Sequence, residues 1–543
     1  MRFRPNGVFI NDAVCEACGD CSVQSNCISV APLNTPLGRK RTIDQSSCNA
    51  DYSCLTGFCP SFVTIEGATP RKEEANTDHL DAAIAELPNP LLPTLDRPYN
   101  LLTTGIGGTG IVTVGAILGM AAHLEGKAVT TLDFTGLAQK NGAVASHIRI
   151  ARNPKSIGPT RMPAGSADLV LACDVVVAAS VPALSRMQSG RTRVVANTYV
   201  QPPGAFVLDT SIDLSSAPAL SAIKRVVGEQ VDTIDGSRIA SKLMGDSLYT
   251  NLFMLGLAWQ KGLIPVSLAA LTRAIELNGA AVPTNKRALS LGRLAAVQPE
   301  AFDFALESAG SGETSAPSVE ELIADRRTRL VAYQNEAYGV RFDCLINVVD
   351  TAEHRLGSKD RCLTAAVARN FYKLMAYKDE YEVARLYTDS AFEQKLANAL
   401  EGRGRRAIYL SPPLIAPRDP ITGLPRKIAF GPWIFSVFRV LARLKVLRGT
   451  WFDPFGLTAE RRRERGLVDQ YERDILVAIQ SLSSTNSETV LALAELPDTI
   501  RGFGHIKDRN MALAEPRRLE LMALLNVSEA SQPYVDVQEK VTA

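Results

Sequence analysis

Residues 99–134, YNLLTTGIGGTGIVTVGAILGMAAHLEGKAVTTLDF, contain the pattern that decides the fold of this chain. An apolar run leads into a glycine-rich segment, an uncharged stretch of helical length follows, and a second β-type run ends at Asp133. This order predicts a strand, a tight turn, a helix and another strand. Further β-type runs, such as HIRIAR and DLVLACDVVVAA, alternate with helical patterns to about residue 300. We therefore expect a doubly wound, Rossmann-like, mostly parallel sheet over residues 99–307.

The glycine-rich segment also has features of a dinucleotide fingerprint. Its glycines permit a tight turn and let a pyrophosphate approach the N-terminus of the helix, and they are Gly105, Gly107, Gly108 and Gly110. Asp133 follows at about the twenty-residue distance expected of the acidic residue in such a site. The alternative is a turn that packs a strand, a helix and a partner chain closely without a nucleotide. His123 and His147 are the candidate acids or bases in this region, and either is equally consistent with a structural histidine.

Seven of the ten cysteines lie between Cys15 and Cys59. The first half-motif is C-x2-C-x2-C-x5-C from Cys15 to Cys27, and the second is C-x2-D-x2-C-x4-C-P from Cys48 to Pro60. Clustered cysteines without a secretory signal indicate metal or redox chemistry rather than a disulfide framework. Bacterial ferredoxins use C-x2-C-x2-C-x3-C-P twice, and the fourth cysteine of each run binds the other cluster. Residues 1–66 are therefore expected to form a ferredoxin-like domain with two 4Fe–4S clusters.

Crossing the fourth ligands gives two sets. The first cluster is predicted to bind Cys15, Cys18, Cys21 and Cys59. The second is predicted to bind Cys27, Cys48 and Cys54, with Asp51 as the candidate fourth ligand. A carboxylate is a harder ligand than a thiolate, so a four-iron cluster with a labile iron and a 3Fe–4S cluster both stay open at Asp51. Zinc is the alternative metal, but the third cysteine two residues on and the Cys-Pro pair favour iron–sulfur.

Composition limits the partners. The 543-residue chain is 46% apolar and 21% charged with a formal net charge of +2, which argues against nucleic acid or an anionic membrane as the main partner. Residues 101–122 carry no charge and are long enough for a membrane span, but their six glycines favour a strand, a turn and a buried helix. With no secretory signal recognised, we expect a cytoplasmic protein.

Composition breaks divide the rest of the chain. Residues 67–98 and 308–318 are predicted linkers, and residues 319–543 are predicted to be mostly helical.

The basic segment GRKR (38–41) is most simply a solvated hairpin turn, and a docking spot for an acidic electron carrier is the alternative. The remaining cysteines are expected to be small buried side chains: Cys173, Cys344 and Cys362. The large aromatic side chains of the tail are expected to pack in the core or against a partner: Trp433, Trp451 and Phe452.

The order of these parts resembles the thiamine-dependent 2-oxoacid:ferredoxin oxidoreductases, and the segment from GIGGTGIVTVG to HIRIAR is similar to their gamma domain. LTAAVARNFYKLMAYKDEYEVARLYTD, AFGPWIFSVFRVLARLKVLRGTWFDPFG and IRGFGHIKD resemble the tail of the large bacterial indolepyruvate:ferredoxin oxidoreductases. The resemblance implies that an arylpyruvate, such as indolepyruvate or phenylpyruvate, reacts with thiamine diphosphate and loses CO2. Electrons then pass through iron–sulfur clusters to ferredoxin, and coenzyme A takes the acyl group as aryl-acetyl-CoA.

One difference from the large bacterial members of that family indicates that the activity is shared between two chains. The sequence contains no GDG…N signature for binding thiamine diphosphate, because GDS at 245–247 lacks the third glycine. We therefore expect thiamine diphosphate and Mg on a catalytic partner chain in a hetero-oligomer, and no catalytic residue in this chain.

The resemblance also weakens the nicotinamide hypothesis, since the family's gamma domain keeps its glycine-rich turn without using NAD as acceptor. The four glycines then form a structural turn that faces the cofactor or coenzyme A, and residues 135–147 line the subunit interface. An NAD- or flavin-dependent iron–sulfur oxidoreductase subunit is the alternative function, and a non-enzymatic electron carrier or assembly module is the third hypothesis.

Overall fold

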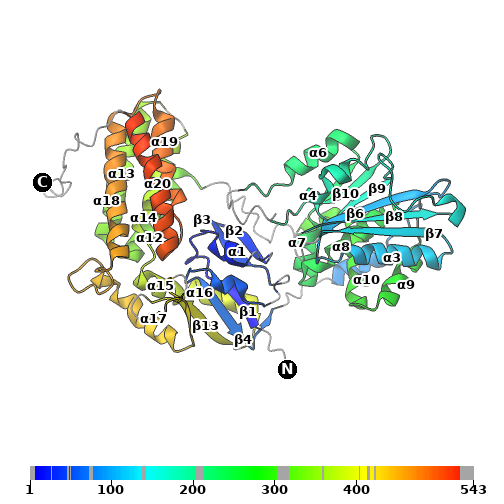
Figure 1. The fold of residues 1–543 in the computed structure, drawn as a ribbon, viewed down its shortest axis with the longest axis horizontal. Helices are drawn as coiled ribbons and strands as arrows, with labels where there is room; N and C mark the ends of the chain where they lie inside the picture. Colours follow the sequence, from blue (N-terminus) through cyan, green and yellow to red (C-terminus); the bar gives the residue numbers. More distant parts are fainter. Residues whose placement is uncertain are drawn as a thin grey trace. The chain divides into compact units, whose positions relative to one another are not determined.

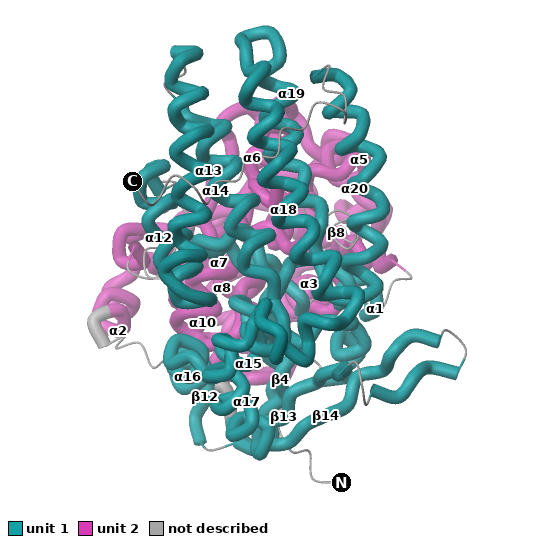
Figure 2. The backbone as a smooth tube through the Cα atoms, turned by 90° about the vertical axis from the view of Figure 1, so that its left-hand side faces the viewer, with its two compact units in different colours: residues 1–43, 50–70, 313–543 teal, residues 44–49, 71–312 magenta. Residues whose placement is uncertain are grey.

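The computed structural model describes residues 6–525, except 26, 28, 46–47, 49, 72–77, 137–141, 203–211, 304–316, 358–359, 403, 413–415 and 421–422. The chain forms two compact units, which Figure 2 shows in different colours. Unit 1 contains residues 1–43, 50–70 and 313–543, and unit 2 contains residues 44–49 and 71–312. Each unit has its own hydrophobic core.

Unit 2 is built on a six-stranded sheet with the order β11-β10-β9-β6-β8-β7. The strands are β6 (Tyr99–Ile106), β7 (Ala128–Thr135), β8 (Ala143–Ala151), β9 (Leu169–Ala172), β10 (Arg193–Asn197) and β11 (Val231–Ile234). β6, β9, β10 and β11 run parallel, whereas β8 is antiparallel to both β6 and β7. The expected α/β character is confirmed, but one reversed strand separates the first two strands of the predicted strand–helix–strand unit.

The residues considered for a membrane span divide between β6 and helix α3 (Ile111–Leu124). The buried side chains of α3 include Val114, Ile117, Leu118 and Ala121, which recur at three- and four-residue spacing and pack on β7 and β8. The membrane-span alternative is therefore wrong for this segment. No helix among the described residues has the length and apolar content needed to cross a bilayer.

Helix α8 (Thr250–Gln260) is the central helix of unit 2, and every one of its residues is buried. It crosses helix α10 (Val282–Val297) at backbone contact distance. A Cβ atom on Gly256 would lie 2.0 Å from the Leu289 carbonyl oxygen, and one on Gly292 would lie 1.8 Å from that of Phe253. Glycine is required at both positions because any side chain would force the helices apart. The other helices of unit 2 are α2 (Asp78–Ala85), α4 (Val175–Ala178), α5 (Val181–Leu184), α6 (Ala217–Val227), α7 (Gly236–Met244) and α9 (Leu268–Asn278).

Unit 1 contains an antiparallel sheet that joins segments far apart in the sequence. Its order is β1-β4-β13-β14, and the strands are β1 (Asn6–Ile10), β4 (Phe62–Glu66), β13 (Arg405–Leu410) and β14 (Ile428–Phe430). β4 pairs with β13 from Glu66 opposite Arg405 to Val63 opposite Ile408. The strand that follows the cysteine-rich segment is thus held in the middle of a sheet completed by the C-terminal half of the chain.

Short elements surround the cysteines. They are the helix α1 (Asp20–Ser25), the hairpin of β2 (Val30–Thr35) and β3 (Gly38–Ile43), and the 3-10 turn η1 (Ser53–Thr56). The two-residue strand β5 (Thr69–Pro70) pairs with β12 (Leu400–Glu401).

The C-terminal region is mostly helical, as expected, and its long helices α12, α13, α14, α18 and α20 run side by side in Figure 1. Stacked aromatic rings of Phe342, Phe371 and Tyr471 fill the centre, with centroid separations of 6.1 and 6.0 Å. The helices are α12 (Val319–Tyr333), α13 (Glu336–Arg355), α14 (Cys362–Met375), α15 (Glu380–Tyr387), α16 (Ser390–Ala399), α17 (Ile434–Arg443), α18 (Ala459–Gln480), α19 (Ser487–Glu495) and α20 (Gly504–Leu524).

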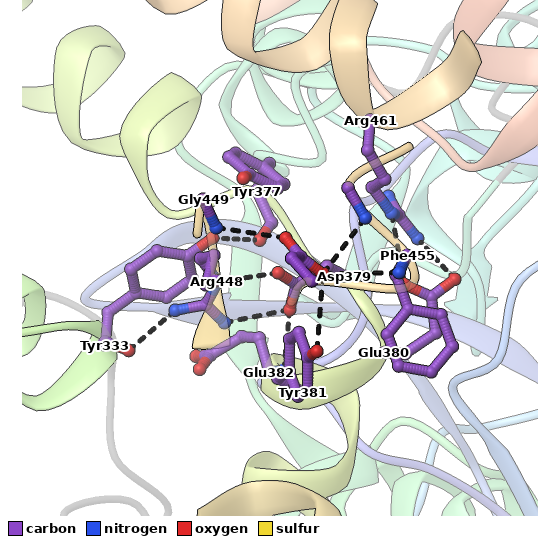
Figure 3. Close-up of polar contacts among 12 residues, drawn as sticks. Tyr333, Tyr377, Asp379, Glu380, Tyr381, Glu382, Arg448, Gly449, Phe455 and Arg461 are labelled. Atoms are coloured by element: carbon purple, nitrogen blue, oxygen red, sulfur yellow. Dashed lines mark hydrogen bonds and ion pairs between the residues drawn. The ribbon is translucent and has the colours of Figure 1, made fainter. Parts of the chain in front are cut away.

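A buried ion pair joins the start of α15 to the segment that precedes α18 (Figure 3). The Arg448 guanidinium donates to both carboxylate oxygens of Asp379 at 2.6 and 2.8 Å. It also donates to the Tyr333 carbonyl at 2.8 Å and lies 3.7 Å from the centroid of that ring. Asp379 in addition accepts the Glu382 backbone N–H at 2.8 Å, so it caps α15. One carboxylate therefore fixes a helix start and neutralises a buried cation.

We expect Arg448→Met to lower the free energy of unfolding of unit 1 by about 3–5 kcal/mol, because it leaves the buried Asp379 carboxylate without its partner. Urea denaturation followed by circular dichroism measures the loss. The matched control is Arg462→Met, because Arg462 is an exposed arginine on α18 and its replacement should change stability by less than about 0.5 kcal/mol. Equal midpoints for the two variants would contradict the assignment.

Candidate functional site

Four predicted cluster ligands are neighbours in unit 1. Cys15, Cys21 and Cys59 are buried and Cys18 is half-buried. Burial raises the pKa of the Cys15, Cys18 and Cys21 thiols, and the negative charge of Cys59 raises the pKa of each further. Such repulsion weakens with separation, which supports the prediction that the last cysteine of the second half-motif shares one site with the first three. Four soft sulfur donors in a buried site suit an iron–sulfur cluster.

The loops of the two half-motifs have matching backbone conformations. In both, the second and fourth residues after the first cysteine lie in the left-handed region: Ala17 (φ 55°), Gly19 (φ 78°), Ala50 (φ 53°) and Tyr52 (φ 60°). This conformation costs a non-glycine residue about 1–2 kcal/mol, and residues that retain it cluster at functional sites. Left-handed residues also help to form concave nests of backbone N–H groups that bind anions, iron–sulfur clusters included. Asp51 therefore occupies the place in its loop that Cys18 occupies in the other.

The predicted ligands of the second cluster have mixed surroundings. Cys54 is buried, Cys27 and Cys48 are half-buried, and Asp51 is exposed. The Oδ1 atom of Asp51 accepts hydrogen bonds from the backbone N–H and the hydroxyl of Ser53, at 3.0 and 2.7 Å. Asp51 thus stabilises the start of η1, which is a structural reason for aspartate at this position. Across the described residues, no three Cys, His, Asp or Glu side chains are spaced to hold a single metal ion, and both ligand sets stay predictions.

Gly57 brings the two half-motifs into contact. A Cβ atom at this position would lie 2.8 Å from Cys21 Cα and 3.0 Å from its backbone nitrogen. Asp20, the residue before Cys21, accepts the Phe58 backbone N–H at 2.7 Å. The segment that leads to Cys59 is therefore held directly against the loop that carries Cys21.

Buried cations surround the cysteines. GRKR (38–41) forms the expected hairpin, but the prediction of a solvated turn is wrong for Lys40 and Arg41, which are 8% and 2% exposed. Burial lowers the pKa of Arg41, and the negative charges of Cys21, Cys15 and Cys18 oppose that shift. On the C-terminal side of the sequence, Lys427 Nζ is buried 5.0 Å from the centroid of Phe62 and has no hydrogen-bond partner among the described residues.

The electrostatics of Lys427 link it to the same cysteines. Burial lowers the pKa of its ammonium, and the charges of Cys59 and Cys21 are the largest opposing causes. A cation at this point compensates the negative charge that thiolates would otherwise concentrate in a low-dielectric interior. Sequence reasoning missed Lys427, because it lies some 370 residues beyond Cys59 and only strand pairing brings the two segments together.

The start of α20 also packs against the cysteine loops. Cβ atoms would lie 3.3 Å from Cys18 Cβ at Gly502 and 2.5 Å from the Phe58 ring at Gly504. The Phe58 and His505 rings have centroids 4.6 Å apart. The segment IRGFGHIKD therefore belongs to the wall of this site, and its two glycines were the sequence signal for that close approach.

The glycine-rich turn of unit 2 is explained by its own packing. A Cβ atom on Gly105 would lie 2.2 Å from the side chain of the first residue of α3. Gly108 and Gly110 each have a φ of 88°, which favours glycine. The Gly107 backbone N–H donates to the Gly142 carbonyl at 2.8 Å. These contacts support the predicted structural turn.

The sheet order separates the turn from the acidic residue of the supposed fingerprint. Asp133 lies on β7, and β8 lies between β7 and β6. Its Oδ1 atom accepts the Ser146 hydroxyl at 2.5 Å. A dinucleotide fold needs that carboxylate on the strand next to the glycine-rich turn, where it meets the ribose. The geometry therefore disfavours nicotinamide binding here.

Small cavities lie beside this turn. One of about 290 Å³ opens where β6, β9 and β10 end, and Thr109, Asn197 and Ser237 help to line it. Asn197 Nδ2 donates to the Ser237 hydroxyl at 2.9 Å. The other, of about 330 Å³, is lined by Gly107, Gly108 and Gly110. Much of the predicted interface segment lies outside the described residues, at 137–141.

Of the other predictions made from the sequence, some are confirmed and some are wrong. His147 is a structural histidine, since its Nδ1 accepts the Met162 backbone N–H at 3.1 Å and burial lowers its pKa to about 4. Cys173 is buried as expected, whereas Cys344 is half-buried and the prediction is wrong for the exposed Cys362. The three aromatic side chains of the tail do not pack in the core, because their exposed fractions are 59%, 94% and 79% for Trp433, Trp451 and Phe452.

Comparison with known proteins covers both halves of the chain. Residues 100–295 match the family described as pyruvate ferredoxin/flavodoxin oxidoreductase, and residues 319–520 match a family of unknown function, DUF6537. Indolepyruvate oxidoreductase subunit IorB of Pyrococcus horikoshii is 29% identical over 206 residues, 37% of this chain and 96% of that protein. Its counterpart in Methanothermobacter thermautotrophicus is 36% identical over 163 residues, 30% of this chain and 77% of that protein.

Among solved structures, the pyruvate oxidoreductase subunit PORC of Thermotoga maritima is 20% identical, with a TM-score of 0.27 over 36% of this chain and 96% of that one. The sequence matches show that the chain belongs to the 2-oxoacid:ferredoxin oxidoreductase family, as the resemblance predicted. Its relatives in that family are the indolepyruvate oxidoreductase subunits named IorB, and it is likewise an enzyme subunit.

We expect Gly57→Ala to lower the iron and acid-labile sulfide bound per chain, because the added methyl group displaces Cys21 from Cys59. Anaerobic purification followed by iron and sulfide analysis measures the change. Gly466→Ala is the matched control, since a Cβ atom there meets no atom within 4 Å. Full metal content in Gly57→Ala would show that the close approach of the two half-motifs is not needed to hold a cluster.

Proposed function

We propose that this chain is the electron-transfer and gamma subunit of an arylpyruvate:ferredoxin oxidoreductase. The complex converts indolepyruvate or phenylpyruvate, with coenzyme A, to the aryl-acetyl-CoA and CO2, and reduces ferredoxin. The observation that carries the proposal is the close approach of the two cysteine half-motifs at Gly57 in a chain whose other unit matches the oxidoreductase family. The names of the relatives support indolepyruvate as the substrate.

This chain's own residues would hold two iron–sulfur clusters. The first would bind the four gathered cysteines, and the second would bind Cys27, Cys48 and Cys54 with Asp51 as the candidate fourth ligand. When bound, such clusters supply one-electron transfer. The surrounding residues bury Cys15, Cys21, Cys54 and Cys59, and they place the positive charges of Arg41 and Lys427 nearby. Both cations favour the reduced, more negative state of a cluster.

The partner subunit would hold thiamine diphosphate and Mg, and coenzyme A and the arylpyruvate would meet at the shared active site. In this chain, the glycine-rich turn would orient the surface that faces that site. The nicotinamide alternative is less well supported, because Asp133 already accepts the Ser146 hydroxyl and β8 separates its strand from β6.

A tagged full-length chain, purified anaerobically from its own organism, tests the function. We expect a co-purified chain that contains thiamine diphosphate, together with ferredoxin reduction that requires indolepyruvate and coenzyme A. Cys59→Ser should abolish ferredoxin reduction, whereas Cys344→Ser should retain it, because Cys344 lies outside the predicted ligand sets. Bound flavin, or reduction of the clusters by NADH in this chain alone, would refute the proposal.

Two substitutions at Asp51 separate ligation from turn formation. If Asp51 lies at the cluster, Asp51→Cys should convert any three-iron electron paramagnetic resonance signal into a four-iron signal, since thiolate is the better ligand. Asp51→Asn keeps the oxygen that accepts from Ser53 but removes the carboxylate, so it should leave the three-iron signal. Wild-type spectra in both variants would show that Asp51 only stabilises the turn.

A further inference from the structure

Unit 1 contains a cavity of about 610 Å³ that the proposed electron transfer does not use. Its walls come from the tip of the β2–β3 hairpin, from α12, α14 and α15, and from the segment between α19 and α20. Cavities that bind small molecules have volumes of about 300–1,000 Å³, so this one has room for a ligand the size of a nucleotide.

The walls of the cavity are strongly basic. Nine lysine and arginine residues line it against four aspartate and glutamate residues, a surplus of five positive charges. The whole chain has a net charge of only +2, so this surplus is a local feature. The basic residues are Arg39, Lys40, Arg326, Arg329, Arg369, Lys373, Lys378, Arg385 and Arg501.

Several of these cations already have carboxylate partners. Lys378 pairs with Glu16, and Arg385 donates to both oxygens of Glu382 at 2.8 and 2.6 Å. Arg501 donates to Asp498 Oδ2 at 2.6 Å. These pairs use three of the four acidic residues of the wall, and Arg326 and Arg329 both pair with Asp325, which is not part of the wall. The cations that remain without a carboxylate partner among the described residues are Lys40 and Arg369.

Lys40 is the cation that most clearly lacks compensation. Lys40 is only 8% exposed. Its ammonium group makes no hydrogen bond or ion pair with any residue that the structure describes. Burial lowers the pKa of Lys40 and the positive charge of Lys378 lowers it further, whereas the negative charges of Glu16 and Cys15 oppose the shift. An ammonium group held in this way is stabilised by an anion that enters the cavity.

Two further basic side chains of the wall differ in how far they are already paired. Lys373 donates to the Pro497 and Asp498 carbonyls at 2.7 and 3.1 Å and pairs with the Asp498 carboxylate at 3.5 Å, and burial lowers its pKa to about 7. Arg369 is exposed at the wall, and its guanidinium has no partner among the described residues. A planar guanidinium and ammonium groups together match the geometry and charge of phosphate oxygens.

We propose that this cavity binds a small molecule that carries a diphosphate group. The unpaired Lys40 and Arg369 favour a ligand with more than one negative charge, and the cavity volume favours a small molecule over an acidic protein surface. The site goes beyond the electron-transfer role and does not depend on it, because it is built from residues outside both predicted ligand sets. Inorganic pyrophosphate and a nucleoside diphosphate are the two sources of this chemistry.

Isothermal titration calorimetry on the full chain tests the site, with pyrophosphate and ADP as probes and sulfate as the control anion. We expect both diphosphates to bind more tightly than sulfate. Lys40→Met and Arg369→Gln should each weaken binding at least about tenfold, and Arg462→Gln, an exposed arginine outside the cavity, should not. ADP binding tighter than pyrophosphate would identify a nucleotide, and equal binding would identify the diphosphate group alone.

Arg369→Gln keeps the test decisive should the buried Lys40→Met variant fail to fold, because Arg369 is exposed. Absence of heat with both diphosphates at about 1 mM would overturn the proposal. Unchanged affinity in the Arg369→Gln variant would also overturn it, whether or not the Lys40→Met variant folds. Neither outcome bears on iron content or ferredoxin reduction, so failure here is distinct from failure of the proposed function.

Discussion

The position of β4 in the sheet of unit 1 is the constraint on which the cysteine site depends. β4 begins at Phe62, three residues after Cys59, and it is held between β1 and β13. Tyr387 donates to the Pro60 carbonyl at 2.7 Å, which fixes the chain immediately after Cys59 from the side of α15. Because a strand with two paired neighbours cannot slip without losing both ladders, Cys59 stays against the first half-motif.

Charge balance follows from that arrangement. Burial and the negative charge of Cys59 raise the pKa values of Cys15, Cys18 and Cys21, so holding these three as thiolates requires nearby positive charge. Arg41 comes from the neighbouring hairpin, whereas Lys427 comes from the segment beside β14. Residues 319–520, which match a family of unknown function, thus contribute strand β13, the Lys427 ammonium and the start of α20 to the surroundings of the cysteines. This gives that region a physical role that the sequence of its helices does not reveal.

Unit 2 uses glycine for a different reason. Its turn is tight because Gly105 contacts α3 and because Gly108 and Gly110 adopt left-handed backbone. A similar turn in a nucleotide-binding fold would have its acidic partner on the adjacent strand, but here β8 occupies that place. The glycine-rich pattern is therefore explained by close packing of the turn. A short motif in a single sequence is insufficient to assign a cofactor.

The sequence by itself determined the mixed α/β character, the helical tail and the grouping of the cysteines into two half-motifs, because these depend on local periodicity and spacing. The family followed from the resemblance of whole segments to known proteins. It also predicted Cys59 as the crossed ligand, an assignment that awaits experiment. Only the tertiary structure decided that β8 separates β6 from β7, that Lys40 and Arg41 are buried, and that Lys427 lies near Cys59. Each of these depends on contacts between segments distant in the chain, and no local propensity records which strands pair or which charges become enclosed together.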